Sequence, residues 1–354
     1  MFCVRRMLML LVVAGLIAPP FYAERLDLLW YIDAAGQRQP IRFKEDWARR
    51  RQHILENFQR VAGALPDRDR QVALDVQVLE ETRLDRITRR RISFVAEPGD
   101  RIFAYLFLPV SPTAKAPAVL CLHQTTRIGK AEPAGLGGKS NLHYALELAQ
   151  RGYATLAPDY PGFGDSQTDP YKLGYASATM KGILNHRRAV DLLQSLPEVA
   201  TDHIGCIGHS LGGHNSIFVA LFDDRIKAVA TSCGFNAFPR YYGGNLKGWG
   251  GKNYMPRITR DFGNDPLRVP FDFPELLAAL APRPVFINAP LHDANFEVSG
   301  VRDCVAAARP VYKLLGVEEN LVARYPDAEH DFPSEVRQKA YEFFDFHLNR
   351  RSHQ

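Results

Sequence analysis

From residue 102 onward, the sequence alternates between short apolar runs and longer segments with helical spacing. The short runs are rich in β-branched and aromatic residues and end at Gly, Pro or polar residues, which is typical of buried strands. Strands that alternate with helices form crossover units, and these place the strands parallel with helices on both faces. The sequence therefore predicts an α/β fold with a mostly parallel, doubly wound sheet.

The element boundaries follow from this spacing. The expected strands are Ile102–Leu108, Ala118–Leu122, Tyr153–Ala157, His203–Ile207, Ile226–Thr231, Pro284–Asn288 and Asn320–Tyr325. The expected helices are Lys44–Val61, Asn141–Arg151, Lys181–Leu196, Leu211–Phe222, Pro274–Leu280, one within Val298–Leu315, and Ser334–Leu348. A length of 354 residues suits one large domain, which we place at residues 101–350, preceded by a helix-and-strand extension at residues 24–100.

The N-terminus has the pattern of a secretory signal peptide. Arg5 and Arg6 precede the apolar run Met7–Ala18, which is shorter than the roughly 20 residues of a membrane-spanning helix. We therefore expect residues 1–23 to be a signal peptide and the protein to be exported to the periplasm or the medium. Phe21 fits a cleavage site imperfectly, so an uncleaved membrane anchor and a misassigned start codon are alternatives.

Charge and cysteine usage exclude several classes of partner. The net charge is +5, and the arginine clusters of residues 24–100 are nearly balanced by acidic residues, so no nucleic-acid partner is expected. No C-x-x-C pair indicates zinc or a redox motif. Cys121, Cys206 and Cys233 lie in or directly after apolar runs and are expected to be buried free thiols.

One sequence motif indicates a catalytic function. Gly208-His209-Ser210-Leu211-Gly212 has the form G-x-S-x-G and lies between an expected strand and an expected helix. A serine on such a sharp turn stands clear of the sheet, and the glycines at Gly208 and Gly212 avoid clashes across the turn. The context therefore favours Ser210 as a nucleophile.

A serine nucleophile needs a base and an orienting acid, which follow it in the order acid, then histidine. Asp293 comes after the strand that ends at Asn288, and His330 comes after the next strand, directly before the last helix. Other candidates fit the order or the position less well: His292, Glu297, Asp303, Asp327 and His347. The predicted catalytic residues are Ser210, Asp293 and His330.

Two backbone amides are expected to form an oxyanion hole. One is the N–H of Leu211, and the other belongs to Gln124 or Thr125, in the loop after the strand Ala118–Leu122. His123 is interpreted as a structural residue that braces this loop. Its spacing to the other histidines His143, His209 and His214 matches no metal-binding pattern, so no metal ligand is predicted.

Residues 234–270 interrupt the alternation with a segment dense in aromatic residues and glycine. Long irregular segments in compact domains are often lids or binding loops, so we expect a lid-like insertion near the site. An ordinary surface insertion with a small core of its own is the alternative. The candidate pocket residues are Phe235, Tyr241, Tyr242 and Trp249.

Over residues 100–350 the chain resembles an α/β-hydrolase of the dienelactone hydrolase, acetyl xylan esterase and prolyl-oligopeptidase-like branch. The resemblance rests on Gly208–Gly213, Asp293, His330, and the segments Ala157–Ser166 and Leu291–Phe296. The chain departs from dienelactone hydrolase in having Ser210 as nucleophile in place of a cysteine, and from H-G-G-G lipases in having Gln124 after His123. Residues 24–100 are too few for the propeller domain of oligopeptidases.

The resemblance implies a serine carboxylesterase that needs no metal or organic cofactor. Its substrate would be a small-molecule or carbohydrate ester, with acetylated sugars as one choice. A prolyl-oligopeptidase-like peptidase is the alternative within enzymes. A non-catalytic binding protein with the same fold is the alternative of a different class.

Overall fold

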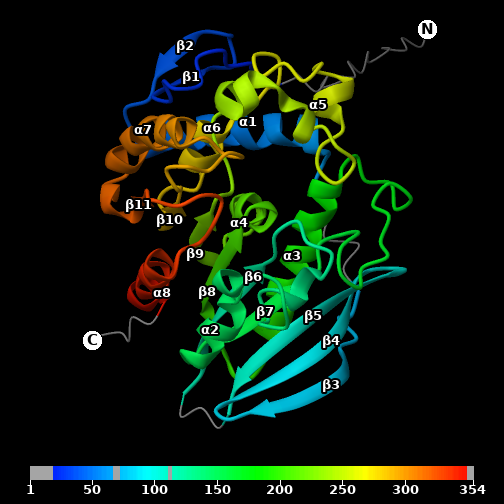
Figure 1. The fold of residues 1–354 in the computed structure, drawn as a ribbon. Coiled ribbons are helices and arrows are strands. Elements are labelled where there is room, and N and C mark those ends of the chain that lie inside the picture. Colours follow the sequence, from blue (N-terminus) through cyan, green and yellow to red (C-terminus); the bar gives the residue numbers. More distant parts are fainter. Residues whose placement is uncertain (1–18, 67–71, 111–113, 349–354) are drawn as a thin grey trace, which may run out of the picture.

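The computed structural model describes residues 19–66, 72–110 and 114–348, and Figure 1 shows their arrangement. The main strands are β3 Gln77–Leu84, β4 Ile87–Glu97, β5 Asp100–Pro109, β6 Ala116–Leu122, β7 Ala154–Pro158, β8 Val199–His209, β9 Ile226–Ser232, β10 Val285–Asn288 and β11 Leu321–Arg324. They form one sheet in the order β11-β10-β9-β8-β6-β7-β5-β4-β3. The strands from β11 to β7 run parallel, and β5, β4 and β3 continue the sheet antiparallel. The predicted α/β class is confirmed.

Apart from the short helix α5, which was not predicted, the helices lie close to the predicted positions. They are α1 Lys44–Ala62, α2 Tyr144–Gln150, α3 Ala178–Ser195, α4 Leu211–Phe222, α5 Arg257–Arg260, α6 Phe273–Ala279, α7 Val298–Leu314 and α8 Ser334–Leu348. α3 begins three residues before the predicted Lys181, because the Ser177 side chain accepts a hydrogen bond from the Met180 amide and caps the helix there. No helix in the described part of the chain has the length and apolar character to cross a bilayer.

Two hydrophobic cores cover the two faces of the sheet. Successive side chains of a strand point to opposite faces. In β6, Ala118, Leu120 and Leu122 join the larger core, which also contains residues of α1, α3, α4, α6 and α7. Val119 and Cys121 join the second core, with residues of α2 and α8. Because both faces are covered, β6 is apolar along most of its length.

Residues 24–100 contribute directly to the main sheet. β3 and β4 are two of its strands, and β4 pairs with β5 from Ile87↔Pro109 to Glu97↔Asp100. The expected boundary at residue 100 thus falls at the first residue of β5, directly after the turn that joins it to β4. The same segment holds the short hairpin β1 Trp30–Ile32 and β2 Arg38–Pro40, and α1, which lies along α6 and α5 (Figure 1). The segment is therefore an integral part of the fold.

The start of the described chain is anchored by Tyr22, which is completely buried. Its hydroxyl accepts a hydrogen bond from the Ile32 amide at 3.0 Å and lies 2.8 Å from His53 Nδ1. The guanidinium of Arg50 lies 3.1 Å from the centre of its ring. Residues 1–18 of the expected signal peptide lie outside the described residues. Cleavage after Ala23 would remove Tyr22 from this core.

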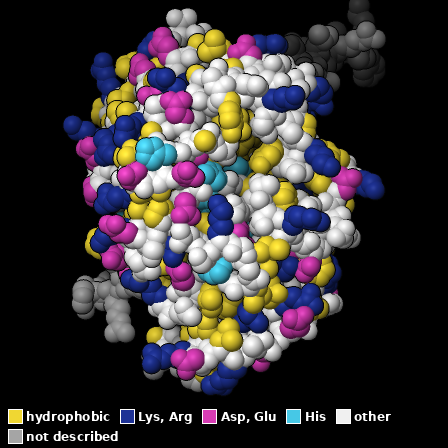
Figure 2. All heavy atoms as spheres, in the orientation of Figure 1, with side chains coloured by type: hydrophobic (Ala, Val, Ile, Leu, Met, Phe, Trp, Pro, Cys, Tyr) yellow, Lys and Arg dark blue, Asp and Glu magenta, His cyan; other side chains and the backbone are white. Residues whose placement is uncertain are grey.

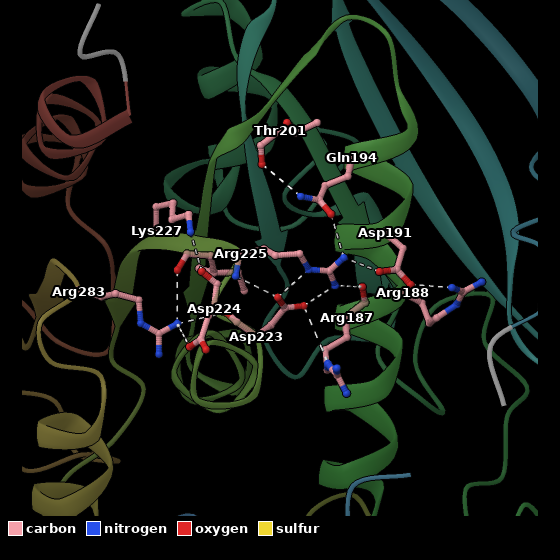
Figure 3. A network of polar contacts seen from close by, with 11 residues as sticks. Arg187, Arg188, Asp191, Gln194, Thr201, Asp223, Asp224, Arg225, Lys227 and Arg283 are labelled. Carbon is pink, nitrogen blue, oxygen red and sulfur yellow. Dashed lines mark hydrogen bonds and ion pairs between the residues drawn. The ribbon is translucent and has the colours of Figure 1, made fainter. Parts of the chain in front are cut away.

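A polar network joins elements at the amino ends of β8 and β9, the edge of the sheet away from Ser210 (Figure 3). The Arg225 guanidinium donates hydrogen bonds to the Asp223 carboxylate, at the end of α4, at 2.6 Å and to the Asp191 carboxylate of α3 at 2.5 Å. Arg283 donates to the Asp223 carbonyl at 3.1 Å. Charge-assisted hydrogen bonds thus connect the end of α4 and the start of β9 to α3, and they offset the desolvation of the buried Asp223 carboxylate.

We predict that Tyr22→Ala lowers the free energy of unfolding by about 3–5 kcal/mol, the usual cost of removing a fully buried aromatic side chain. Urea denaturation of protein that starts at residue 19 measures the effect. Phe21→Ala is the matched control, since Phe21 is 45% exposed. Equal stability of the two variants would contradict the anchoring role of Tyr22.

Candidate active site

Ser210 occupies a strained turn between β8 and α4. Its backbone has φ 53° and ψ −115°, a conformation that residues with a side chain rarely adopt. A Cβ atom on Gly208 would lie 2.1 Å from the Gly212 carbonyl oxygen, and one on Gly212 would lie 1.9 Å from the Leu122 carbonyl oxygen. Both positions therefore require glycine for the turn to form.

Asp293 and His330 form a hydrogen-bonded pair. His330 Nδ1 lies 2.9 Å from each carboxylate oxygen of Asp293. The amides of Asn295 and Phe296 donate to Asp293 Oδ1 at 2.8 and 3.0 Å. Burial raises the pKa of the Asp293 carboxyl, but the hydrogen bond and charge of His330 outweigh it and leave that pKa below its usual value. Asp293 is therefore ionised at neutral pH and holds the imidazole by Nδ1.

This pair and Ser210 lie at the same carboxyl edge of the parallel strands, since Ser210 follows β8, Asp293 follows β10 and His330 follows β11. The His330 ring lies edge-on to the ring of His209, with 4.8 Å between the centroids, and His209 directly precedes Ser210. The rival residues pair elsewhere: His292 Nε2 lies 2.7 Å from Asp327 Oδ1, and both side chains are largely exposed. His330 and Asp293 are thus hydrogen-bonded to each other at the sheet edge that holds Ser210, whereas His292 and Asp327 pair in a solvent-exposed position.

His123 braces the loop that was expected to supply an oxyanion donor. Its Nδ1 lies 2.6 Å from the Gln124 carbonyl oxygen, and its Nε2 accepts from the Tyr160 amide at 3.0 Å. Burial lowers the pKa of His123, so the ring is neutral with its proton on Nδ1. The Gln124 side chain donates to Glu132 at 3.0 Å. The loop is therefore fixed on both sides of the Gln124 backbone.

A cavity of about 370 Å³ opens at Ser210. Its lining residues are Gln124, Thr125, Ser210, His214, Tyr241, Gly248, Trp249, Tyr254, Asn295 and Phe296. None of these is Asp, Glu, Lys or Arg. Figure 2 shows histidine and hydrophobic side chains around a hollow in the middle of one face, with charges of both signs interspersed over the rest of it.

The lid-like segment supplies part of this cavity. Tyr241 and Trp249, two of the predicted pocket residues, line it. Tyr242 is 61% exposed, and its hydroxyl lies 3.1 Å from Asn295 Oδ1, next to the cavity lining. Phe235 takes a different place: its ring is buried and stacks on Phe273 of α6, with 5.3 Å between centroids. Three of the four predicted residues thus lie at or beside the cavity.

Comparison with known proteins identifies the family. The sequence profile of the Alpha/beta hydrolase family matches residues 119–338, which include Ser210, Asp293 and His330. The chain belongs to this family. The resemblance stated from the sequence is thereby confirmed. The alpha/beta hydrolase is also similar to YtaP of Bacillus subtilis (strain 168), a protein named as a hydrolase, with 27% identity over 273 residues that cover 73% of this chain and 87% of YtaP.

Solved structures share the fold of this alpha/beta hydrolase. A glucuronoyl esterase from Solibacter usitatus superposes with a TM-score of 0.71 at 19% identity, over 90% of this chain and 96% of that one. An acetyl xylan esterase from Paenibacillus sp. R4 superposes with a TM-score of 0.59 at 19% identity, over 78% of this chain and 90% of that one.

Five lining residues of the alpha/beta hydrolase were not predicted from the sequence: His214, Gly248, Tyr254, Asn295 and Phe296. His214 lies one helical turn after Ser210, so helix periodicity was a usable signal. Asn295 and Phe296 closely follow Asp293 in the same loop. Tyr254 places its hydroxyl 3.3 Å from Thr125 Oγ1, but nothing in the sequence separates it from its aromatic neighbours.

We predict that Gly212→Ala lowers the free energy of unfolding by at least about 1–3 kcal/mol, the usual cost of overpacking, because the new methyl group meets backbone that cannot move aside. Thermal unfolding followed by circular dichroism measures it. Gly251→Ala is the matched control, since a Cβ there has its nearest contact at 3.6 Å. A Gly212→Ala protein as stable as Gly251→Ala would refute the close approach of the two backbones.

Proposed function

We propose that this protein is a serine carboxylesterase that acts through an acyl-enzyme. The observation that carries the proposal is the strained turn of Ser210 at the same sheet edge as the His330–Asp293 pair. Strained backbone persists where surrounding structure over-determines it, and such sites are often functional. A nucleophile, a base and an orienting carboxylate in this order fit acyl transfer.

The proposed reaction has two halves. Ser210 Oγ attacks the ester carbonyl while His330 Nε2 takes the hydroxyl proton, and the tetrahedral intermediate then collapses as His330 returns that proton to the leaving alcohol. In the second half, His330 deprotonates a water molecule that attacks the acyl group, and the acid product leaves as Ser210 regains its proton. Asp293 keeps the imidazole in one tautomer throughout.

The oxyanion that forms in each half needs donors that are already in place. The Leu211 amide is at the first position of α4, where amides have no acceptor within the helix. We assign the second donor to the amide of Gln124 or Thr125, since both residues line the cavity with Ser210. Each such donor contributes about 3–4 kcal/mol of transition-state stabilisation.

The cavity favours a neutral ester as substrate. Its lining combines aromatic rings with amide and hydroxyl groups and carries no Lys or Arg that would pair with a carboxylate on the substrate. Aromatic faces with a few polar groups suit a sugar or another small ring. The names of the structural neighbours, acetyl xylan esterase and glucuronoyl esterase, point to carbohydrate esters, and the uncharged lining suits acetyl esters and uronic acid esters alike, since both are neutral.

Export stays part of the proposal. The signal-like pattern of residues 1–23 would place a carbohydrate esterase in the periplasm or the medium, where its polymeric substrates are found. Membrane attachment would follow only if that segment were retained. The mechanism itself calls for no metal or organic cofactor.

We predict that Ser210→Ala lowers the rate of p-nitrophenyl acetate hydrolysis by at least about 10⁴-fold and abolishes labelling by a fluorophosphonate probe. Ser216→Ala is the control, because Ser216 lies in α4, the helix that follows Ser210, and does not line the cavity. Circular dichroism checks that each variant is folded. Full activity in Ser210→Ala would overturn the proposal, and a failure of the native protein to react with the probe would favour a binding role.

We also predict an order of substrates, measured as kcat/KM on a matched panel. Acetylated xylo-oligosaccharides and the methyl ester of glucuronic acid should both be hydrolysed, because each is a neutral ester that suits the uncharged lining of the cavity. Both should exceed a fluorogenic prolyl peptide. A peptide that reacts fastest would establish the peptidase alternative instead.

A further inference from the structure

His330 of the proposed catalytic pair also belongs to a second group of side chains, with His209 and Cys233. His209 ends β8, Cys233 directly follows β9, and His330 lies in the loop between β11 and α8. One ligand atom of each, two imidazole nitrogens and a sulfur, all lie within 4.8 Å of one another. His209 and Cys233 are buried, whereas the His330 side chain is 26% exposed. The cluster is thus reached from solvent at His330.

Both imidazoles are held by Nδ1, which leaves Nε2 to face the cluster or the nucleophile. His209 Nδ1 lies 2.8 Å from Ser232 Oγ, and His330 Nδ1 lies 2.9 Å from both Asp293 oxygens. Histidines that bind metals are oriented in the same way, by a carboxylate or another acceptor behind the ring. His209 Nε2 is buried and has no hydrogen-bond partner among the residues that the structure describes. An unpaired buried nitrogen is costly, and a ligand there would satisfy it.

The three ligand atoms favour particular metal ions. Two imidazole nitrogens and one thiolate suit a borderline-soft ion such as Zn²⁺, which binds nitrogen at about 2.0–2.1 Å and sulfur at about 2.3 Å. Tetrahedral bonds of these lengths hold ligand atoms about 3.4–3.6 Å apart. The observed distances between the three ligand atoms reach up to 4.8 Å, which is about an ångström more than in a formed site. A small shift of the partly exposed His330 loop would close this difference.

We propose that His209, Cys233 and His330 form an inhibitory site for Zn²⁺ or a similarly soft divalent cation. Binding displaces the thiol proton of Cys233, so the sulfur becomes a thiolate bonded to the ion and one proton passes to solvent. Both imidazoles bind as neutral ligands. The imidazole lone pair of His330 that would accept the Ser210 proton is then bonded to the ion. This last consequence, inhibition, rests on the proposed function, whereas binding itself does not.

The binding test uses the full chain after treatment with a chelator. Zn²⁺ is titrated by calorimetry into the native protein, Cys233→Ser and the control Cys304→Ser, which removes another buried free thiol outside the cluster. We expect one ion per chain in the native and control proteins and at least a tenfold weaker affinity in Cys233→Ser. Cd²⁺ should give a thiolate charge-transfer absorbance that Cys233→Ser lacks. Equal Zn²⁺ affinity in Cys233→Ser and the native protein would overturn the site.

His209→Asn provides a second route should Cys233→Ser fail to fold, since it removes the other buried ligand atom and keeps a polar group beside Ser232. It too should bind Zn²⁺ at least tenfold more weakly, and unchanged affinity would count against the site.

The inhibition test measures p-nitrophenyl acetate hydrolysis, with each variant compared to its own metal-free rate. Zn²⁺ should inhibit the native protein over the concentration range in which it binds, and a chelator should restore the rate. Ser210→Ala should still bind one ion. Binding without any esterase activity would refute the proposed function and leave the site standing, whereas activity without binding would refute the site alone.

Discussion

The site depends on the close approach of two backbones, those of Gly212 and Leu122. A Cβ on Gly212 would lie 1.9 Å from the Leu122 carbonyl oxygen, so the start of α4 is pressed against the end of β6. This contact sets where α4 begins and forces Ser210 to φ 53°. It also brings the first amides of α4 beside the loop at Gln124. The positions of the proposed nucleophile and of the candidate oxyanion donors therefore both follow from this one backbone contact.

The loops around this contact are fixed by buried polar pairs. Lys130 Nζ bonds to Asp159 at 2.7 Å and to Asp165 at 2.8 Å, and Asp159 precedes Tyr160, whose amide holds His123. Charged groups in such places cost desolvation and repay it only when every partner is present. The result is a loop with few alternative positions. Preorganised amides of this kind stabilise a developing charge without reorganising during the reaction.

The sequence predicted those features that local patterns encode. Alternating strands and helices gave the sheet class, and α4 and α8 begin and end at the predicted residues. What it missed depends on contacts between distant segments. β3 is exposed over nearly its whole length, so it lacks the burial pattern that marks a strand, and its pairing with β4 had no signal. Tyr22 lay within a segment read as a signal peptide, and only the fold reveals its burial.

The N-terminal segment is joined to the cavity by a continuous chain of contacts. Arg50 of α1 bonds to Glu275 at 2.7 Å. Glu275 accepts from the Asp272 amide at 3.1 Å, and Asp272 accepts from the Phe238 amide at 2.9 Å. The Phe238 ring packs edge-on against Trp249, which lines the cavity. Since all five of these residues are buried, the segment that precedes the predicted catalytic domain helps fix the aromatic wall beside Ser210.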